Sequence, residues 1–277
     1  MRRNDWTLIA EDGTELYARS WHPGERTALL GAVCLVHGMG EHGERYARLA
    51  ESLTAAGFAV FAHDQRGHGR TPGQRGHTPL EEAVSDACRL IGEARSQCEG
   101  VPVFLYGHSM GGNVALNCAL RENPPIQGLI LSSPWLRLAS PPPAVQVWLG
   151  KQISRFAPRF TQSTRLKLQD LYRSGYTDSA AWHDLYNHTK ITVSTYLAFH
   201  ESGEWALHHA DRLSCPLLLL HGTADRVVSY AASEELASRT ERLCTFLSWE
   251  DNLHELHNDL DGESVAASVV FWLRTYL

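Results

Sequence analysis

The chain of 277 residues is long enough for one large α/β domain with an insertion, or for two small domains. Its hydrophobic content of 43% and charged content of 20% are ordinary for a soluble globular protein, and the net charge of −6 argues against general nucleic-acid binding. No apolar run approaches the roughly 18 residues that a membrane span needs, and polar residues follow Met1-Arg2-Arg3, where a signal peptide would become apolar.

The six cysteines form no CxxC pair and no regular framework. Several of them fall in predicted strands or helices, where free cysteine behaves as a small apolar residue. We therefore expect reduced thiols and a cytoplasmic location.

Apolar runs and helical patterns alternate along the first half of the chain. The predicted elements are a hairpin over residues 6–9 and 15–21, a strand over 30–36, a helix over 44–56, a strand over 58–62, a helix over 80–97, a strand over 101–106, a helix over 113–120 and a strand over 127–131. Strand–helix alternation of this kind predicts a mostly parallel sheet covered by helices on both faces.

The alternation stops between about residues 135 and 210, which contain several helical stretches and no convincing strand. It returns with a strand over 215–221, a helix over 229–238, a strand over 244–249 and a terminal helix from residue 263. We predict a core domain of residues 1–134 and 211–277, with residues 135–210 as a helical cap insertion over the active edge of the sheet.

The sequence Gly107-His108-Ser109-Met110-Gly111 joins the predicted strand over 101–106 to the predicted helix over 113–120. This is the G-x-S-x-G pattern in its strand–turn–helix setting, where a strained turn presents the serine above the sheet. The alternative is a Gly/Ser-rich turn without chemical importance. With both flanking elements in place, the pattern predicts Ser109 as a nucleophile.

A serine hydroxyl needs a base to take its proton, and the base needs an acid to orient it. Asp225 follows the predicted strand over 215–221, and His254 lies in the loop after the last predicted strand, which predicts them as acid and base. The alternatives are His257 as the base, Glu250 or Asp251 as the acid, and a capping role for Asp225. Because His254 and His257 are three residues apart, the HExxH zinc motif is absent and no metal is predicted.

A tetrahedral intermediate needs two donors for its oxyanion. We expect the backbone N–H of Met110, directly after the nucleophile, and the N–H of Met39 in the glycine-rich loop over residues 37–40. His37 is expected to hold this loop rather than to act as a second base. Asp64 and Arg66 are expected to form a local ion pair or a backbone clamp.

Together these motifs resemble the α/β-hydrolase superfamily, and within it the monoacylglycerol lipase and lysophospholipase group. The matching segments are residues 37–42 with Arg45-Tyr46, residues 64–69, 107–112 and 221–228, and His254-Glu255-Leu256. The resemblance implies Ser109, Asp225 and His254 as a catalytic triad, with Met39 and Met110 as oxyanion donors. It also implies hydrolysis of a single-acyl glycerol ester without a metal or an organic cofactor.

Within the insertion, apolar residues recur at helical spacing from Val145 to Phe160, beside an excess of basic residues. Residues 135–175 carry seven basic residues against Asp170 as the single acidic one. Such a helix can rest on an anionic membrane surface. The alternative is that the stripe packs on the core domain and the charges are simply solvated. In either case we expect the apolar face to line an acyl-chain pocket; its residues are Trp148, Leu149, Ile153 and Phe156.

The sequence leaves other functions open. A lysophospholipase, a general carboxylesterase or a thioesterase would use the same triad. A peptidase of the same fold would need an anchor for an amine, for which Glu201 and Glu204 are candidates. A non-catalytic binding protein is disfavoured, because the triad residues are all present.

Overall fold

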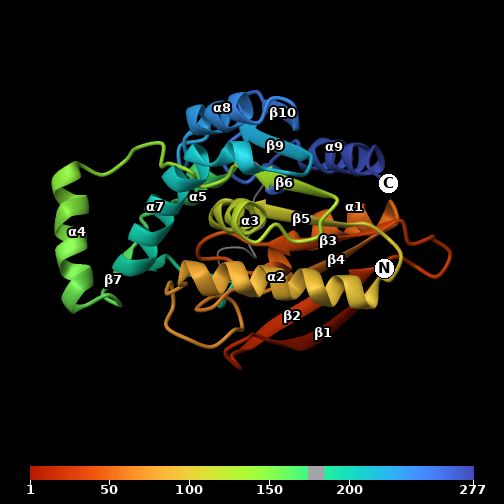
Figure 1. Ribbon diagram of the computed structural model, residues 1–277, viewed down its shortest axis with the longest axis horizontal. Coiled ribbons are helices and arrows are strands. Elements are labelled where there is room, and N and C mark those ends of the chain that lie inside the picture. The colour runs from red at the N-terminus through yellow and green to blue at the C-terminus, as the bar shows by residue number, and fades with distance from the viewer. Residues whose placement is uncertain (174–183) are drawn as a thin grey trace.

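The computed structural model describes residues 1–173 and 184–277, and a twisted sheet of eight strands lies at its centre (Figure 1). In chain order these strands are β1 (Arg2–Ile9), β2 (Glu15–His22), β3 (Gly31–Val36), β4 (Phe58–His63), β5 (Val103–His108), β6 (Gly128–Ser132), β9 (Leu217–Gly222) and β10 (Cys244–Trp249). Their order across the sheet is β1-β2-β4-β3-β5-β6-β9-β10. Strand β2 pairs antiparallel with both of its neighbours, β1 and β4. From β4 to β10 in this order the strands run parallel, so their carboxyl ends meet at one edge.

Helices cover both faces of this sheet, as the sequence predicts. The core helices are α1 (Ala47–Ala55), α2 (Leu80–Gln97), α3 (Met110–Arg121), α8 (Tyr230–Arg239) and α9 (Gly262–Arg274), with short 3₁₀ helices η1 (Gly43–Tyr46), η2 (Ala210–Arg212) and η3 (Leu256–Asn258). Alternate side chains of a strand point to opposite faces. Accordingly, Cys34 of β3 packs with α2 and α3, whereas Val33 and Leu35 pack with α1 and α9.

The segment between β6 and β9 carries the elements α4 (Ala144–Phe156), β7 (Thr161–Ser163), α5 (Leu168–Leu171), β8 (Lys190–Thr192) and α7 (Val193–His208). The two short strands β7 and β8 pair antiparallel, where no strand is expected from the sequence. Residues 174–183 of the predicted cap lie outside the described residues. Of the helices that the described residues form, none combines the length and the apolar character needed to cross a bilayer.

Helix α7 is fixed to the core through buried polar contacts, whereas α4 stands away from it (Figure 1). Asn113 of α3 donates to the carbonyl oxygens of Trp135 and Phe199 at 2.8 and 3.1 Å, and Ser202 donates to Asn113 at 2.7 Å. No residue of α4 is buried. The segment between β6 and β9 therefore has one helix, α7, tied to α3 and one helix, α4, at its outer end.

Candidate active site

Ser109 occupies the sharp turn between β5 and α3. Its backbone has φ of 53° and ψ of −118°, a left-handed conformation that is strained for a residue with a side chain. The turn can close because its flanking glycines lack a Cβ atom. A Cβ atom at Gly107 would lie 2.3 Å from the carbonyl oxygen of Gly111, and a Cβ atom at Gly111 would lie 2.1 Å from the carbonyl oxygen of Val36. The strain and the glycines together place the hydroxyl at the amino end of α3.

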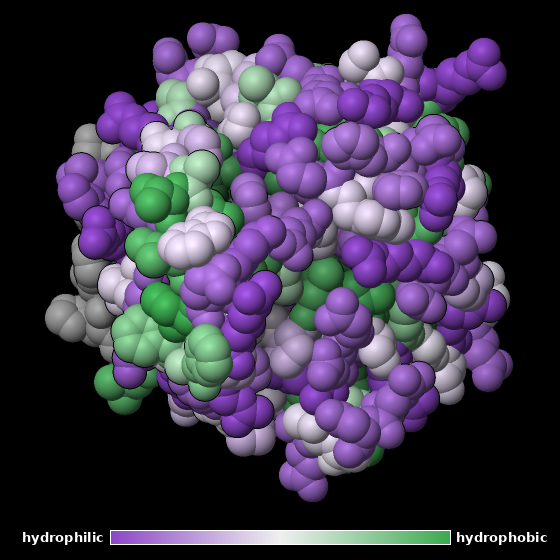
Figure 2. Space-filling model, turned by 60° about the vertical axis from the view of Figure 1, so that its left-hand side comes forward, coloured by the Kyte–Doolittle hydropathy of each residue, from purple (hydrophilic) through white to green (hydrophobic). Residues whose placement is uncertain are grey.

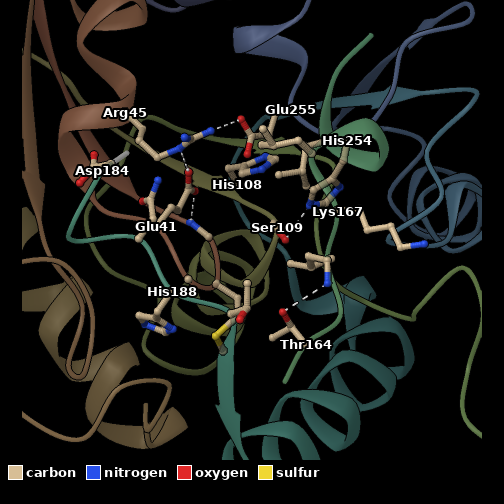
Figure 3. A pocket seen from close by; sticks show the side chains of 18 residues that line it. Glu41, Arg45, His108, Ser109, Thr164, Lys167, Asp184, His188, His254 and Glu255 are labelled. Carbon is tan, nitrogen blue, oxygen red and sulfur yellow. Dashed lines mark hydrogen bonds and ion pairs between the residues drawn. The ribbon is translucent and has the colours of Figure 1, made fainter. Parts of the chain in front are cut away.

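The three residues predicted as a triad are joined by hydrogen bonds, and Figure 3 shows two of them, Ser109 and His254, at the cavity. Nε2 of His254 lies 2.9 Å from Oγ of Ser109, and Nδ1 of His254 lies 2.7 Å from Oδ2 of Asp225. Both distances are those of ordinary hydrogen bonds. The arrangement gives a proton path from the hydroxyl to the imidazole, with the carboxylate fixing the tautomer in which Nδ1 carries the proton.

Asp225 is held as a buried carboxylate. Its Oδ1 accepts the backbone N–H groups of Val227 and Val228 at 2.7 and 3.1 Å. Burial alone would raise the pKa of this carboxyl, but the charges and hydrogen bonds of His254 and His221 outweigh burial, so that the pKa lies far below its usual range. Asp225 is therefore ionised at neutral pH, as an acid that orients and stabilises an imidazolium must be.

The residues considered as an alternative base or acid do not form the hydrogen bonds of the triad. His257 is buried against Tyr46, with the ring centroids 4.4 Å apart, and neither of its ring nitrogens has a hydrogen-bond partner in the described part of the chain. Burial lowers its pKa to about 4. Glu250 and Asp251 are exposed. The hydrogen bonds to Ser109 and Asp225 are made by His254 instead.

The two residues predicted as oxyanion donors, Met39 and Met110, lie close to Ser109. Met110 is the first residue of α3, so its N–H is one of those that a helix leaves without an internal acceptor. The loop that carries Met39 lies against Ser109, because a Cβ built on Gly38 would lie 3.2 Å from the Cβ of Ser109. Met39 and Ser109 both line one cavity.

His37 fits the structural role expected for it. Its Nε2 accepts the backbone N–H of Gln65 at 2.9 Å, and its Nδ1 lies 2.8 Å from the carbonyl oxygen of Gly38. Asp64 acts as a backbone clamp, accepting the N–H groups of Gly43 and Arg70, both at 2.9 Å.

Arg66 is not the ionic partner of Asp64. It pairs instead with Asp86 at 2.7 Å and with Asp12 at 2.5 Å. Of the two expected arrangements for Asp64 and Arg66, the backbone clamp is therefore the one observed.

A cavity of about 330 Å³ opens in front of Ser109 and His254. Apolar side chains from α5 and the segment before it form one part of its lining, which includes Leu166, Leu168 and Leu171. Polar and charged groups form another part, and Figure 3 labels several of them. They include Glu41, Arg45, Thr164, Lys167, Asp184, His188 and Glu255. The cavity thus offers both apolar surface and several hydrogen-bonding groups close to the nucleophile.

The residues expected to contact an acyl chain are not brought to this cavity. Trp148, Leu149, Ile153 and Phe156 lie on α4 with their side chains exposed, from 41% for Ile153 to 89% for Phe156. None of them lines the cavity. The physical reason is the position of α4, which faces α7 through Gly150 and turns its apolar stripe outward. The expectation is corrected accordingly: the apolar lining comes from residues 166–171.

Of the charged residues that line the cavity, Glu41, Arg45 and Glu255 contact one another, and the sequence motifs assign no catalytic role to them. Glu41 and Arg45 belong to a motif on which the family resemblance rests, and Glu255 follows the predicted base directly. Their places in or beside these motifs could have marked them as candidates from the sequence. Their contacts with one another could not be predicted, because Arg45 and Glu255 are 210 residues apart.

Comparisons with known proteins agree with this architecture. The family described as serine aminopeptidase, S33, matches residues 27–261. The monoacylglycerol lipase of Mycolicibacterium smegmatis is 30% identical over 278 residues, which cover 99% of this chain and 98% of the relative. An abhydrolase domain-containing protein of Dictyostelium discoideum is 29% identical over 272 residues, which cover 96% of this chain and 28% of that longer protein. The crystal structure of Paleococcus ferrophilus monoacylglycerol lipase superposes with a TM-score of 0.86 at 34% identity, covering 95% of this chain and 100% of the other.

Proposed function

Because the chain belongs to the α/β-hydrolase family described as serine aminopeptidase, S33, and matches monoacylglycerol lipases along its whole length, we propose that it hydrolyses monoacylglycerols to fatty acid and glycerol. The chain is a serine ester hydrolase of the monoacylglycerol lipase group. The observation that carries the proposal is the hydrogen-bonded series from Ser109 through His254 to Asp225, at the wall of a cavity with both apolar and polar lining.

In the proposed reaction, His254 accepts the proton of Ser109 through Nε2 as the serine oxygen attacks the ester carbonyl. The carbonyl oxygen becomes an oxyanion, which the backbone N–H groups of Met39 and Met110 stabilise. His254 then donates the proton to the departing glycerol oxygen. In the second half, His254 takes a proton from the water that attacks the acyl-enzyme and returns it to Oγ of Ser109 as the fatty acid leaves. Asp225 holds the imidazole and offsets its positive charge throughout.

The charges of the cavity favour an ester over an amine-bearing substrate. An aminopeptidase needs an anion for the substrate's ammonium group. The described carboxylates in the lining are already engaged: Glu41 and Glu255 with Arg45, and Asp184 with His42 at 2.6 Å.

Glu201 and Glu204, the amine anchors considered from the sequence, are also engaged. Glu201 pairs with Lys151 at 2.8 Å, and Glu204 pairs with Arg137 at 2.6 Å. Neither carboxylate lines the cavity. Hydroxyl groups of a glycerol leaving group, by contrast, need no net charge and suit the mixed donors and acceptors around the loop of Gly38.

We also propose that residues 135–210 act as the cap over this site and that α4 touches the surface of the lipid phase that supplies the substrate. Support comes from the exposed apolar side chains of α4, with Val145 and Trp148 exposed at 62% and 58%. Figure 2 turns that side of the molecule forward and shows apolar side chains gathered along one part of the surface. Lys151, Arg155 and Arg159 add the positive charge that anionic lipids attract.

The substrate class is tested by a panel at equal concentrations: 2-oleoylglycerol, oleoyl-lysophosphatidylcholine, p-nitrophenyl butyrate and leucine p-nitroanilide. We expect kcat/KM to be highest for the monoacylglycerol and no turnover of the amide. The Ser109→Ala variant is the control and should leave the fold intact while abolishing hydrolysis. A higher kcat/KM for leucine p-nitroanilide than for every ester would contradict the proposal.

A further inference from the structure

We propose that Glu255 is a positioning residue that, through Arg45 and Glu41, fixes the loop of the base His254 against the loop of the oxyanion donor Met39. The inference rests on the proposed acyl transfer and assigns a function to three buried charges that the triad does not include. Figure 3 shows this series of side chains running along one wall of the cavity, from Glu255 through Arg45 to Glu41.

At one end of the series, Glu41 holds the oxyanion loop directly. Its Oε1 accepts the backbone N–H of Gly38 at 2.5 Å and the hydroxyl of Tyr46 at 2.6 Å. The peptide that follows Gly38 carries the N–H of Met39. By fixing the Gly38 amide, the Glu41 carboxylate thus restrains the direction of the neighbouring N–H group, on which oxyanion stabilisation depends.

In the middle of the series, Arg45 bridges the two carboxylates. Its Nε donates to Oε2 of Glu41 at 3.0 Å, and its terminal guanidinium nitrogen donates to Oε2 of Glu255. The three side chains are 6–9% exposed. A guanidinium is suited to this position because its rigid, planar donors can serve two acceptors in fixed directions, which a lysine ammonium cannot do.

At the other end, Glu255 is itself held in place. Its side chain accepts the amide of Asn258 at 2.8 Å, and its backbone N–H donates to the carbonyl oxygen of Leu171 at 2.7 Å. Glu255 is the residue next to His254 in the chain. Any displacement of its backbone therefore moves the imidazole relative to the hydroxyl of Ser109.

The series also has an electrostatic effect on His254, because two carboxylates and one guanidinium leave one net negative charge close to the imidazole. The titratable groups that face His254 are Asp225, Glu41, Glu255, His108 and His257. Burial lowers the pKa of His108 and His257 well below the ordinary histidine value, so these two stay neutral near pH 7. Glu41 and Glu255 therefore reinforce Asp225 in favouring the imidazolium form that catalysis produces.

The test is the Glu255→Gln variant, with the exposed Glu250→Gln in the same loop as its matched control. Hydrolysis of p-nitrophenyl butyrate is measured from pH 5 to 9, after the wild-type rate has been established. We expect Glu255→Gln to lose roughly ten- to hundredfold in kcat with little change in KM, as small displacements of a reacting group do. We also expect its acid limb to move to lower pH, because a negative charge near His254 is removed. Glu250→Gln should match the wild type in both respects.

A second variant separates positioning from charge and from folding. Asn258→Ala removes the hydrogen bond that orients Glu255 but keeps every charge, so we expect a lower kcat with an unchanged acid limb. If Glu255→Gln and Asn258→Ala both keep kcat within twofold of the wild type and the acid limb in place, the inference is contradicted, whatever their melting temperatures. If the wild type itself turns over no ester, the failure belongs to the proposed function instead.

Discussion

The two carboxylate oxygens of Asp225 accept hydrogen bonds from different groups. Oδ1 accepts the backbone N–H groups of Val227 and Val228, and Oδ2 accepts the Nδ1–H of His254. An amide side chain in this position can keep its backbone contacts, but it also offers an NH₂ group that favours the wrong tautomer of His254. The orientation of the imidazole thus depends on the charge and acceptor character of Oδ2, and not only on the shape of the side chain.

We expect Asp225→Asn to lower kcat by roughly 10³- to 10⁴-fold in steady-state ester hydrolysis. Asp251→Asn, which changes an exposed carboxylate in the neighbouring loop, is the control and should retain the wild-type rate. If Asp225→Asn hydrolyses esters at nearly the full rate, another carboxylate orients the histidine.

The pH dependence of hydrolysis depends on His254. Burial alone would lower its pKa, but the charge and the hydrogen bond of Asp225 outweigh burial and raise the pKa above 6.5. Only the neutral imidazole can accept the serine proton, so kcat/KM should fall as the pH falls through this raised value. We expect an acid limb with its midpoint above pH 6.5, checked at each pH against the melting temperature. A midpoint well below pH 6.5 would show that a different group limits the rate.

The roles of individual residues could be predicted from the sequence where a single motif identifies the residue. Ser109, Asp225 and His254 each follow a predicted strand, and parallel strands bring their carboxyl ends to one edge, so their meeting was expected. The series from Glu41 through Arg45 to Glu255 was not expected. An ion pair between loops 210 residues apart depends on the angle at which the loops leave the sheet, which periodicity does not reveal.

Among the elements, the junction of β5 and α3 is the most constrained, because a Cβ at Gly111 would lie 2.1 Å from the carbonyl oxygen of Val36. A backbone oxygen in the sheet cannot move aside as the end of a flexible side chain can. We expect Gly111→Ala to destabilise the protein by about 1–3 kcal/mol or more and to remove activity, measured by urea unfolding and ester hydrolysis.

Gly92 offers a matched comparison, since it lies exposed within α2 and an added Cβ would meet nothing within 4 Å. Gly92→Ala should raise the free energy of unfolding by roughly 0.5–1 kcal/mol, because alanine is the better helix former. Equal effects of the two substitutions would show that close approach at Gly111 does not constrain the turn.

Element types were predictable in the core because central strands such as β3, β4 and β9 are apolar runs and the helices have a clear apolar stripe. The pair β7 and β8 was missed, since three residues are too few for a strand pattern to be visible. The stripe on α4 was predicted correctly as amphipathic, but periodicity does not show what an apolar face contacts. In the structure that face is exposed and contributes nothing to the cavity.

At the scale of the whole molecule, helix α4 lies at the opposite end from α9 (Figure 1), and its large apolar side chains are exposed. We expect the double variant Trp148→Ser, Phe156→Ser to bind liposomes more weakly than the wild type in a sedimentation assay, because less apolar surface enters the lipid interface. Phe271→Ser on α9, which removes a side chain that is 73% exposed, is the control and should not change binding. Equal binding by all three proteins would remove the support for a membrane-facing α4.

The contribution of the basic residues beside the apolar stripe of α4 to membrane binding can be measured separately from that of the apolar side chains. Replacing Lys151, Arg155 and Arg159 with Glu should weaken binding to vesicles that contain phosphatidylserine and leave binding to phosphatidylcholine vesicles nearly unchanged. The effect should shrink as salt is added, since these residues are exposed. Unchanged binding to the anionic vesicles would contradict a role for these charges.

The most direct measurement is peptide mass spectrometry after incubation with a fluorophosphonate, which reports whether one hydroxyl of the chain is activated as a nucleophile. We expect one phosphonyl group per chain, located on Ser109, with labelling lost in Ser109→Ala and strongly slowed in His254→Ala. Labelling of another residue in the wild type, or equal labelling of Ser109 in His254→Ala, would contradict the activation of Ser109 by His254.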